Sequence, residues 1–207
     1  LAKSYIDEYN DVDSTSDMAN DEGRPDSLSP TPGASTDMQD WILWFNDYIN
    51  HIKRYQTNTG QNRVVLFVSP PGASDIASEG DPTGDPFSAE RTVNNYKAVY
   101  EHPDGSPNVY ELDGQLYKSL DDVFRDNPDT LFIPITAPPL DPNDTEEAVA
   151  ARARSFNDWL VAKYNNPVTG RSNVEVFDWF DVLAYPDSES AEQRNRLREV
   201  YRGSGQH

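Results

Sequence analysis

The sequence predicts an α/β domain with three layers, in which helices cover both faces of a parallel central sheet. Two short, unbroken apolar runs, "RVVLFV" at 63–68 and "TLFIPIT" at 130–136, are typical of strands that are buried on both faces. A third such strand is expected at 174–177. Segments with helical periodicity separate these runs, and strands separated by helices need crossover connections, which make them parallel.

The helices are expected from the spacing of apolar residues and from capping signals. Thr36 and Gln39 form a capping box that opens a helix over 36–55, with an apolar stripe of Trp41, Phe45, Tyr48, Ile52 and Tyr55. Ser88 is expected to cap a second helix, in which Val93, Tyr96 and Tyr100 share a face. Asp144 and Glu147 form a capping pair for a long helix, with a stripe of Val149, Ala153, Phe156, Leu160 and Tyr164.

Smaller elements complete the domain. Asp113-Gly114 lies between alternating apolar residues, a pattern that predicts a β-hairpin inserted at the surface. A short helix is expected at 120–127, and a last helix at about Ser190–Tyr201. The α/β domain therefore spans residues 36–207.

Residues 1–35 are expected to form an acidic N-terminal segment that is mostly loop, with a short helix at "LAKSYIDEY". Within it, the spacing of a calcium-binding loop is matched by Asp11, Asp13, Thr15, Asp17 and Glu22. Ser16 stands where such a loop needs its turn glycine. This difference favours a solvated acidic loop, and no metal site is predicted.

The formal charge of −19, from 36 acidic and 17 basic residues, argues against binding of nucleic acid, because a polyanion is repelled. The absence of cysteine excludes disulfides, thiolate catalysis and cysteine-ligated metals. No apolar run reaches the roughly 18 residues that a membrane span requires. We therefore expect a soluble protein without a cofactor, in an extracellular or periplasmic location.

Both principal strands run into a hydroxyl residue followed by two prolines, "SPPGAS" from Ser69 and "TAPP" from Thr136. Ligands of open α/β sheets bind at the carboxyl ends of the strands, so both loops are expected at one edge, together with Asp178 after the third strand. Proline cannot continue a central strand, because it has no N–H to donate. The alternative interpretation of each motif is therefore a strand stop with a capping hydroxyl, and that of Asp178 a helix cap.

An ordered series of segments resembles a group of bacterial SGNH/GDSL-type hydrolases. The series comprises "TDMQDWILWFNDY", "VVLFVSPPGASDI" with "EGDPTGDPF", "TVNNYKAVY", "NPDTLFIPITAPPL", "ARARSFNDWLVAKY" and "NVEVFDWFDVLAYPD". The resemblance implies a flavodoxin-like fold and hydrolysis of esters, often on acylated carbohydrates. It implies a nucleophilic serine after a first strand and a histidine in a loop after the last helix.

Candidate catalytic residues are Ser69 and His207, since a serine hydroxyl needs a histidine to take its proton. The other two histidines, His51 and His102, are expected to be surface residues. The resemblance also implies a first strand and a terminal histidine loop that the sequence as given lacks. Oxyanion-stabilising or substrate-binding roles are assigned to Pro70, Gly72, Ala73, Ser74, Asp75, Thr136 and Asp178.

Two functions follow from this pattern. The first is ester or acyl hydrolysis on a carbohydrate or lipid by a Ser-His-Asp mechanism. The second is a non-catalytic module of the same fold that binds a glycan or a partner. The four tryptophans are mostly expected in the core, but one exposed at the site could stack on a sugar ring.

Overall fold

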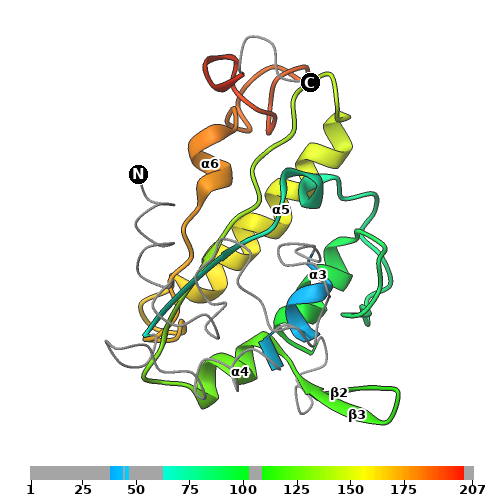
Figure 1. Cartoon of the computed structure of the whole chain (residues 1–207). Helices are drawn as coiled ribbons and strands as arrows, with labels where there is room; N and C mark the ends of the chain where they lie inside the picture. The colour runs from blue at the N-terminus through cyan, green and yellow to red at the C-terminus, as the bar shows by residue number, and fades with distance from the viewer. Residues whose placement is uncertain (1–37, 44, 47–62, 103–108, 203–207) are drawn as a thin grey trace, which may run out of the picture.

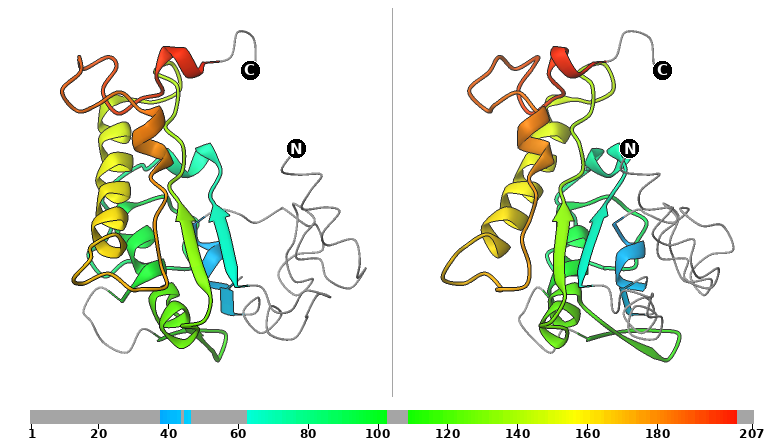
Figure 2. Two further views of the ribbon diagram at one scale, coloured as in Figure 1. Left: turned by 90° about the vertical axis from the view of Figure 1, so that its left-hand side faces the viewer. Right: turned by 60° about the vertical axis from the view of Figure 1, so that its left-hand side comes forward.

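The computed structural model describes residues 38–43, 45–46, 63–102 and 109–202. Their central feature is a pair of parallel strands, β1 (Val64–Val68) and β4 (Leu131–Ile135), with Val64 opposite Leu131 and Val68 opposite Ile135. The two strands point the same way in both views of Figure 2. The parallel direction predicted from the sequence is therefore confirmed.

The third strand that the sequence predicts at 174–177 is present as a segment that forms isolated β-bridges with β4, on the side of β4 opposite to β1. Phe132 pairs with Val174 and Ile135 with Phe177, both in parallel. Backbone bonds continue the ladder, with Phe132 N donating to Asn173 O over 2.9 Å and Phe177 N to Pro134 O over 2.9 Å. The strand order is thus β1, β4, then 174–177.

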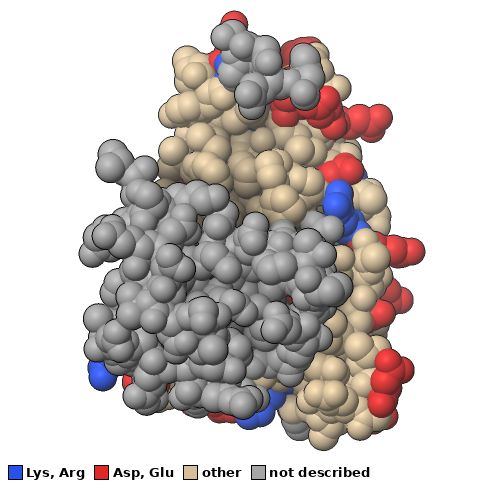
Figure 3. Space-filling view, in the orientation of Figure 1, with Lys and Arg blue, Asp and Glu red and all other residues tan. Residues whose placement is uncertain are grey.

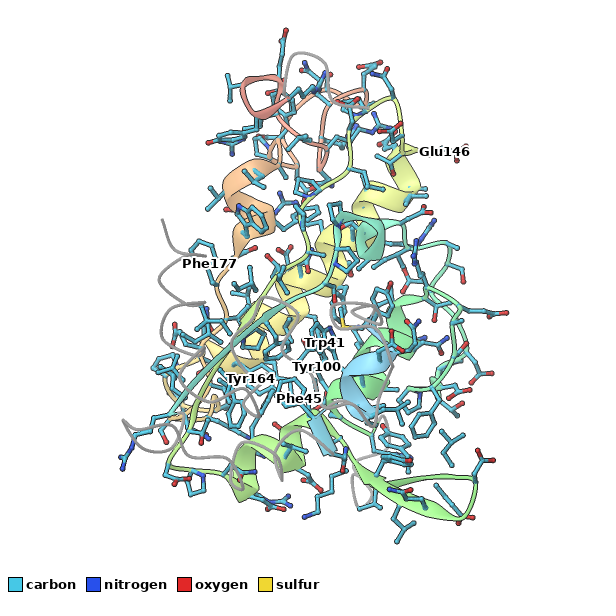
Figure 4. All side chains as sticks on the ribbon, in the orientation of Figure 1. Trp41, Phe45, Tyr100, Glu146, Tyr164 and Phe177 are labelled. Carbon is cyan, nitrogen blue, oxygen red and sulfur yellow. The ribbon has the colours of Figure 1, made fainter. Side chains whose placement is uncertain are left out.

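Helices cover one face of this sheet (Figure 1). They are the helical residues 40–43 and 45–46, here called the Trp41 helix, with α3 (Val93–Tyr100), α4 (Leu120–Asp126) and α5 (Glu147–Tyr164). Aromatic side chains fill the space between them and the sheet, with Phe45 and Phe67 rings 4.7 Å apart and Phe124 and Phe132 rings 4.6 Å apart. The Trp41 and Phe45 side chains lie in this central core in Figure 4.

The described helices do not form the expected layer on the second face. Val65, Phe67, Phe132, Val174 and Val176 on the inner face are buried, whereas the alternate residues of the same strands are exposed or partly exposed. The part of the chain that the structure describes therefore forms two layers of a mixed α/β domain. The flavodoxin-like third layer stays a prediction, as does the boundary at residue 35, which lies outside the described residues.

The predicted hairpin is confirmed as β2 (Val109–Leu112) paired with β3 (Gln115–Lys118) in antiparallel register. Asp113 and Gly114 have φ of 54° and 80°, the left-handed conformations of a tight two-residue turn. The predicted short helix is confirmed as α4, where Ser119 accepts a hydrogen bond from Asp122 N.

The predicted starts of two helices are wrong. Thr92, not Ser88, caps α3, because its hydroxyl accepts from Asn95 N, while Ser88 Oγ accepts from Glu90 N in the preceding turn. The long helix α5 begins at Glu147 rather than after Asp144. The residues before α5 form a turn instead of helix, in which Asp144 N donates to Asp141 O over 2.9 Å. The apolar stripe of α5 is confirmed from Ala153 to Tyr164.

The last predicted helix is also wrong. Residues 190–198 form turns and isolated β-bridges, in which Arg194 pairs with Tyr185 and Leu197 with Ala184, and only a 3-10 turn at Glu199–Tyr201 follows. Asn195 has a φ of 62°, and its N–H donates to Tyr185 O over 3.0 Å instead of to the preceding helical turn. The short helix α6 (Trp179–Leu183) precedes this loop. No described helix is long and apolar enough to cross a membrane.

Candidate functional site at the carboxyl edge of the sheet

The two proline loops meet at the carboxyl ends of β1 and β4, as the sequence predicts. Residues Pro71–Ser74 form a 3-10 turn, η1, directly after β1. Ser74 Oγ donates to Pro138 O over 2.8 Å and approaches Ala137 O at 3.3 Å. This side chain therefore ties the loop after β1 to the loop after β4, so that both form one rim.

Ser69 is buried at this rim, with 4% of its surface exposed. Trp41 Nε1 donates to Ser69 Oγ over 2.8 Å, which joins the Trp41 helix to the end of β1. An indole N–H can only donate, so it cannot take the proton of the hydroxyl. The candidate partner His207, like His51, lies outside the described residues, and the nucleophile assignment remains a prediction.

His102, the histidine within the described ranges, stacks on Tyr110 of the hairpin with ring centroids 5.2 Å apart. It follows α3 and packs against β2, a surface position of the kind that the sequence predicts. Thus the described contacts of His102 do not join it to Ser69.

Thr136 connects β4 to α6 and is 1% exposed. Its Oγ1 accepts from Phe180 N over 2.7 Å and donates to Asp178 Oδ1 at 3.1 Å. Asp178 also accepts from Asp181 N at 3.1 Å, so the helix-cap interpretation of Asp178 is confirmed. Both side chains hold the start of α6 at the rim.

The remaining candidates divide into buried and accessible residues. Ala73 and Ser74 are buried, whereas Asp75 is exposed and Pro70 and Gly72 are partly exposed. Pro70 and Pro71 have no N–H, and Ala73 N already donates to Pro70 O over 2.9 Å. Within Pro70–Ala73, this leaves the amide of Gly72 as the candidate oxyanion donor.

Arg91 is a neighbour of Gly72 that the sequence did not indicate. A Cβ built on Gly72 would lie 3.4 Å from Arg91 Nη1 and 3.7 Å from its Cζ. The guanidinium therefore covers the turn after β1. Nothing in the spacing of Arg91, which is distant from the strand end in sequence, could have predicted this contact.

A recess of about 420 Å³ adjoins Asp75 at the same edge. Its other lining residues precede or begin α5 and are Asn143, Asp144, Thr145, Glu146 and Val149. Glu146 marks this position at the start of α5 in Figure 4, and Figure 3 shows acidic side chains along the described margin of that view. Three carboxylates in the lining disfavour an anionic ligand.

Further acids surround Arg154, which is buried between α5, α6 and the following loop. Its Nη1 donates to Asp181 Oδ1 over 3.0 Å, and its guanidinium lies 5.1 Å from the Phe180 ring. Burial raises the pKa of Asp158, and the positive charge of Arg154 only partly offsets this rise. The negative charges of Asp178, Asp187 and Asp181 raise the pKa further. No group of His, Asp and Glu in the described residues has the arrangement of a metal site.

Trp179 is the exposed aromatic residue at the start of α6, with 37% of its surface accessible, whereas Trp41 is 5% exposed. It directly follows the capping residue Asp178, at the carboxyl edge. Trp179 thus fits the predicted tryptophan that could stack on a ligand.

A second cavity, of about 400 Å³, lies at the opposite, amino edge of the sheet. Its charged lining residues are Asp121, Arg125, Lys163 and Arg171. Arg171 Nε donates to Asp121 Oδ1 over 2.8 Å, and Lys163 pairs with Glu101. These basic side chains are neutralised by carboxylates, so we place the candidate site at the carboxyl edge.

Comparisons of the chain with protein-family models, with curated proteins and with solved structures found no match.

Proposed function

We propose that the chain forms part of an SGNH-type hydrolase-like domain, which binds an ester of a carbohydrate or lipid at the carboxyl edge of its sheet. The observation that carries the proposal is the rim itself, where Ser74 joins the loop after β1 to the loop after β4. Parallel α/β sheets bind ligands at this edge. The resemblance of the sequence segments adds the reaction type, hydrolysis through a Ser-His-Asp mechanism.

In this proposal the residues of the rim have separate tasks. The amide of Gly72 donates to the oxyanion that forms when the ester carbonyl is attacked, and an N–H in this role contributes about 3 kcal/mol to transition-state stabilisation. Trp179 stacks on the sugar ring. The carboxylates of the adjoining recess, Asp75, Asp144 and Glu146, select a neutral substrate over an anionic one.

The alternative is a non-catalytic module in which the same rim binds a glycan or a partner. The burial of Ser69 and its hydrogen bond from Trp41 favour this alternative, because both are typical of a structural hydroxyl. Hydrolysis requires that Ser69 be reached by substrate and by a base, or that another serine act as nucleophile.

Release of p-nitrophenol from p-nitrophenyl acetate by the full chain separates these functions. If Ser69 is the nucleophile, Ser69→Ala abolishes release above the buffer rate, whereas Trp41→Phe, which removes the indole N–H and keeps an aromatic ring at this position, retains it. Release that Ser69→Ala leaves unchanged assigns the nucleophile elsewhere. If the unsubstituted chain gives no release above buffer, hydrolysis is refuted and the binding module stands.

A further inference from the structure

The outer face of the parallel sheet is apolar and uncovered by any described helix. The register places Val64 beside Leu131, Leu66 beside Ile133, and Val68 beside Ile135, which in turn pairs with Phe177. Exposed fractions are 51% for Val64, 60% for Leu66, 37% for Val68, 36% for Leu131 and 51% for Phe177. Phe177 lies across the strands from Trp41 and Phe45 in Figure 4. We call these residues, with Ile133 and Ile135, the outer face.

This composition is that of a buried surface. Parallel sheets are covered on both faces, whereas a face in contact with water carries alternating polar residues. Glu175 is the single charged residue that the three segments place among the outer positions. A contiguous apolar surface of this kind marks a contact with another element or molecule.

The order of the strands explains why the described helices lie on the inner face and leave the outer face uncovered. The order β1, β4, 174–177 moves across the sheet in one direction. Because crossovers are right-handed, both connections, with α3, α4 and α5, come to lie on the same face. The Trp41 helix also packs on that face, since Trp41 and Phe67 rings are 5.2 Å apart. The described helices within residues 38–177 therefore lie on the inner face, and none of them covers the outer face.

Residues 1–9, "LAKSYIDEY", have the chemistry that this surface requires. Leu1, Tyr5, Ile6 and Tyr9 recur at the spacing of one helical face, with Lys3, Asp7 and Glu8 among the other positions. Residues 203–207, "GSGQH", hold no large apolar residue. In the sequence, Tyr48 and Ile52 continue the helical spacing of Trp41 and Phe45, and these last two residues are buried on the inner face.

The connection is long enough, because residues 10–37 can span about 90 Å when extended. A second copy of the chain is the other candidate occupant. The formal charge of −19 opposes association of two copies. We propose that residues 1–9 form an amphipathic helix that packs on the outer face and completes the third layer. This inference is independent of the proposed hydrolysis.

The absence of cysteine allows a direct test in the full chain. Leu66→Cys places a thiol on the outer face, and Leu116→Cys places a control thiol on the hairpin, where Leu116 is 67% exposed. With N-ethylmaleimide, we expect Leu66→Cys to react at least tenfold more slowly than Leu116→Cys. Tyr5→Asp with Ile6→Asp should raise the rate of Leu66→Cys towards that of the control and leave the control unchanged. Far-UV circular dichroism verifies that each variant is folded.

Three results would overturn the proposal. Equal rates for the two thiols in the otherwise unsubstituted chain would show that the outer face is bare. Slow reaction at Leu66→Cys that speeds up on dilution would assign the cover to a second copy. Slow reaction that depends neither on concentration nor on the Asp substitutions would assign it to another segment.

Discussion

Replacement of Thr136 by valine should destabilise the domain strongly, although the two side chains have almost the same shape. The Thr136 hydroxyl accepts from Phe180 N over 2.7 Å and donates to Asp178 Oδ1 at 3.1 Å. Thr136 and Phe180 are each 1% exposed, so water cannot replace the lost partner of Phe180 N without structural change. A neutral hydrogen bond contributes about 1 kcal/mol and one to a charged group about 2 kcal/mol. We expect a loss of about 3 kcal/mol in the free energy of unfolding.

Urea unfolding, followed by tryptophan fluorescence and far-UV circular dichroism, measures this loss. With a slope of about 2 kcal/mol per M, Thr136→Val should lower the urea midpoint by about 1.5 M. Thr136→Ser is the matched control, since it keeps the hydroxyl and should lose less than about 1 kcal/mol. Equal losses for both variants, or a loss below about 0.5 kcal/mol for Thr136→Val, would refute the role assigned to the hydroxyl.

Three further predictions concern the elements around the sheet. Arg154→Lys should cost about 2 kcal/mol in urea unfolding, because an ammonium group cannot contact Asn195 and Asp181 together as the guanidinium does. Burial raises the pKa of Asp121, but the hydrogen bonds from Arg171 and the charges of Lys163 and Arg171 outweigh it, so the pKa lies below the ordinary value of an aspartate. The resulting stabilisation is present above that ordinary pKa and is lost as the pH falls through the lowered pKa, so Asp121→Asn should flatten the acid limb of stability in urea titrations. Gly170→Ala should lower the melting temperature more than Gly114→Ala does, because its Cβ would lie 2.1 Å from Tyr164 O, whereas at Gly114 the Cβ has free space and only the left-handed φ of 80° opposes the substitution.

Local patterns in the sequence predicted the elements whose stability depends on near neighbours. The hairpin follows from Asp113-Gly114, and the short helix expected at 120–127 corresponds to α4. The parallel direction of β1 and β4 was expected from the helices between them, because a crossover connection that contains helices is typical of parallel strands.

The last helix was predicted wrongly because the structure of its segment depends on contacts with distant parts of the chain. Residues 190–201 have helical composition, but Asn195 is held by Arg154 and Tyr185, which come from α5 and the loop after α6. At the candidate site, the two proline loops were predicted to meet, whereas the hydrogen bond from Trp41 to Ser69 and the position of Arg91 over Gly72 were not. Such pairs carry no spacing signal, because their members lie far apart in the chain.

The most direct test of the ligand-binding rim is an amide chemical-shift titration of the full chain with acetylated xylo-oligosaccharides. The proposal predicts that the largest changes fall on Gly72, Asp75 and Thr136, with no change at Leu116 on the hairpin. Changes concentrated at Lys163 and Arg171, at the opposite edge of the sheet, or no saturable change at any amide, would contradict it.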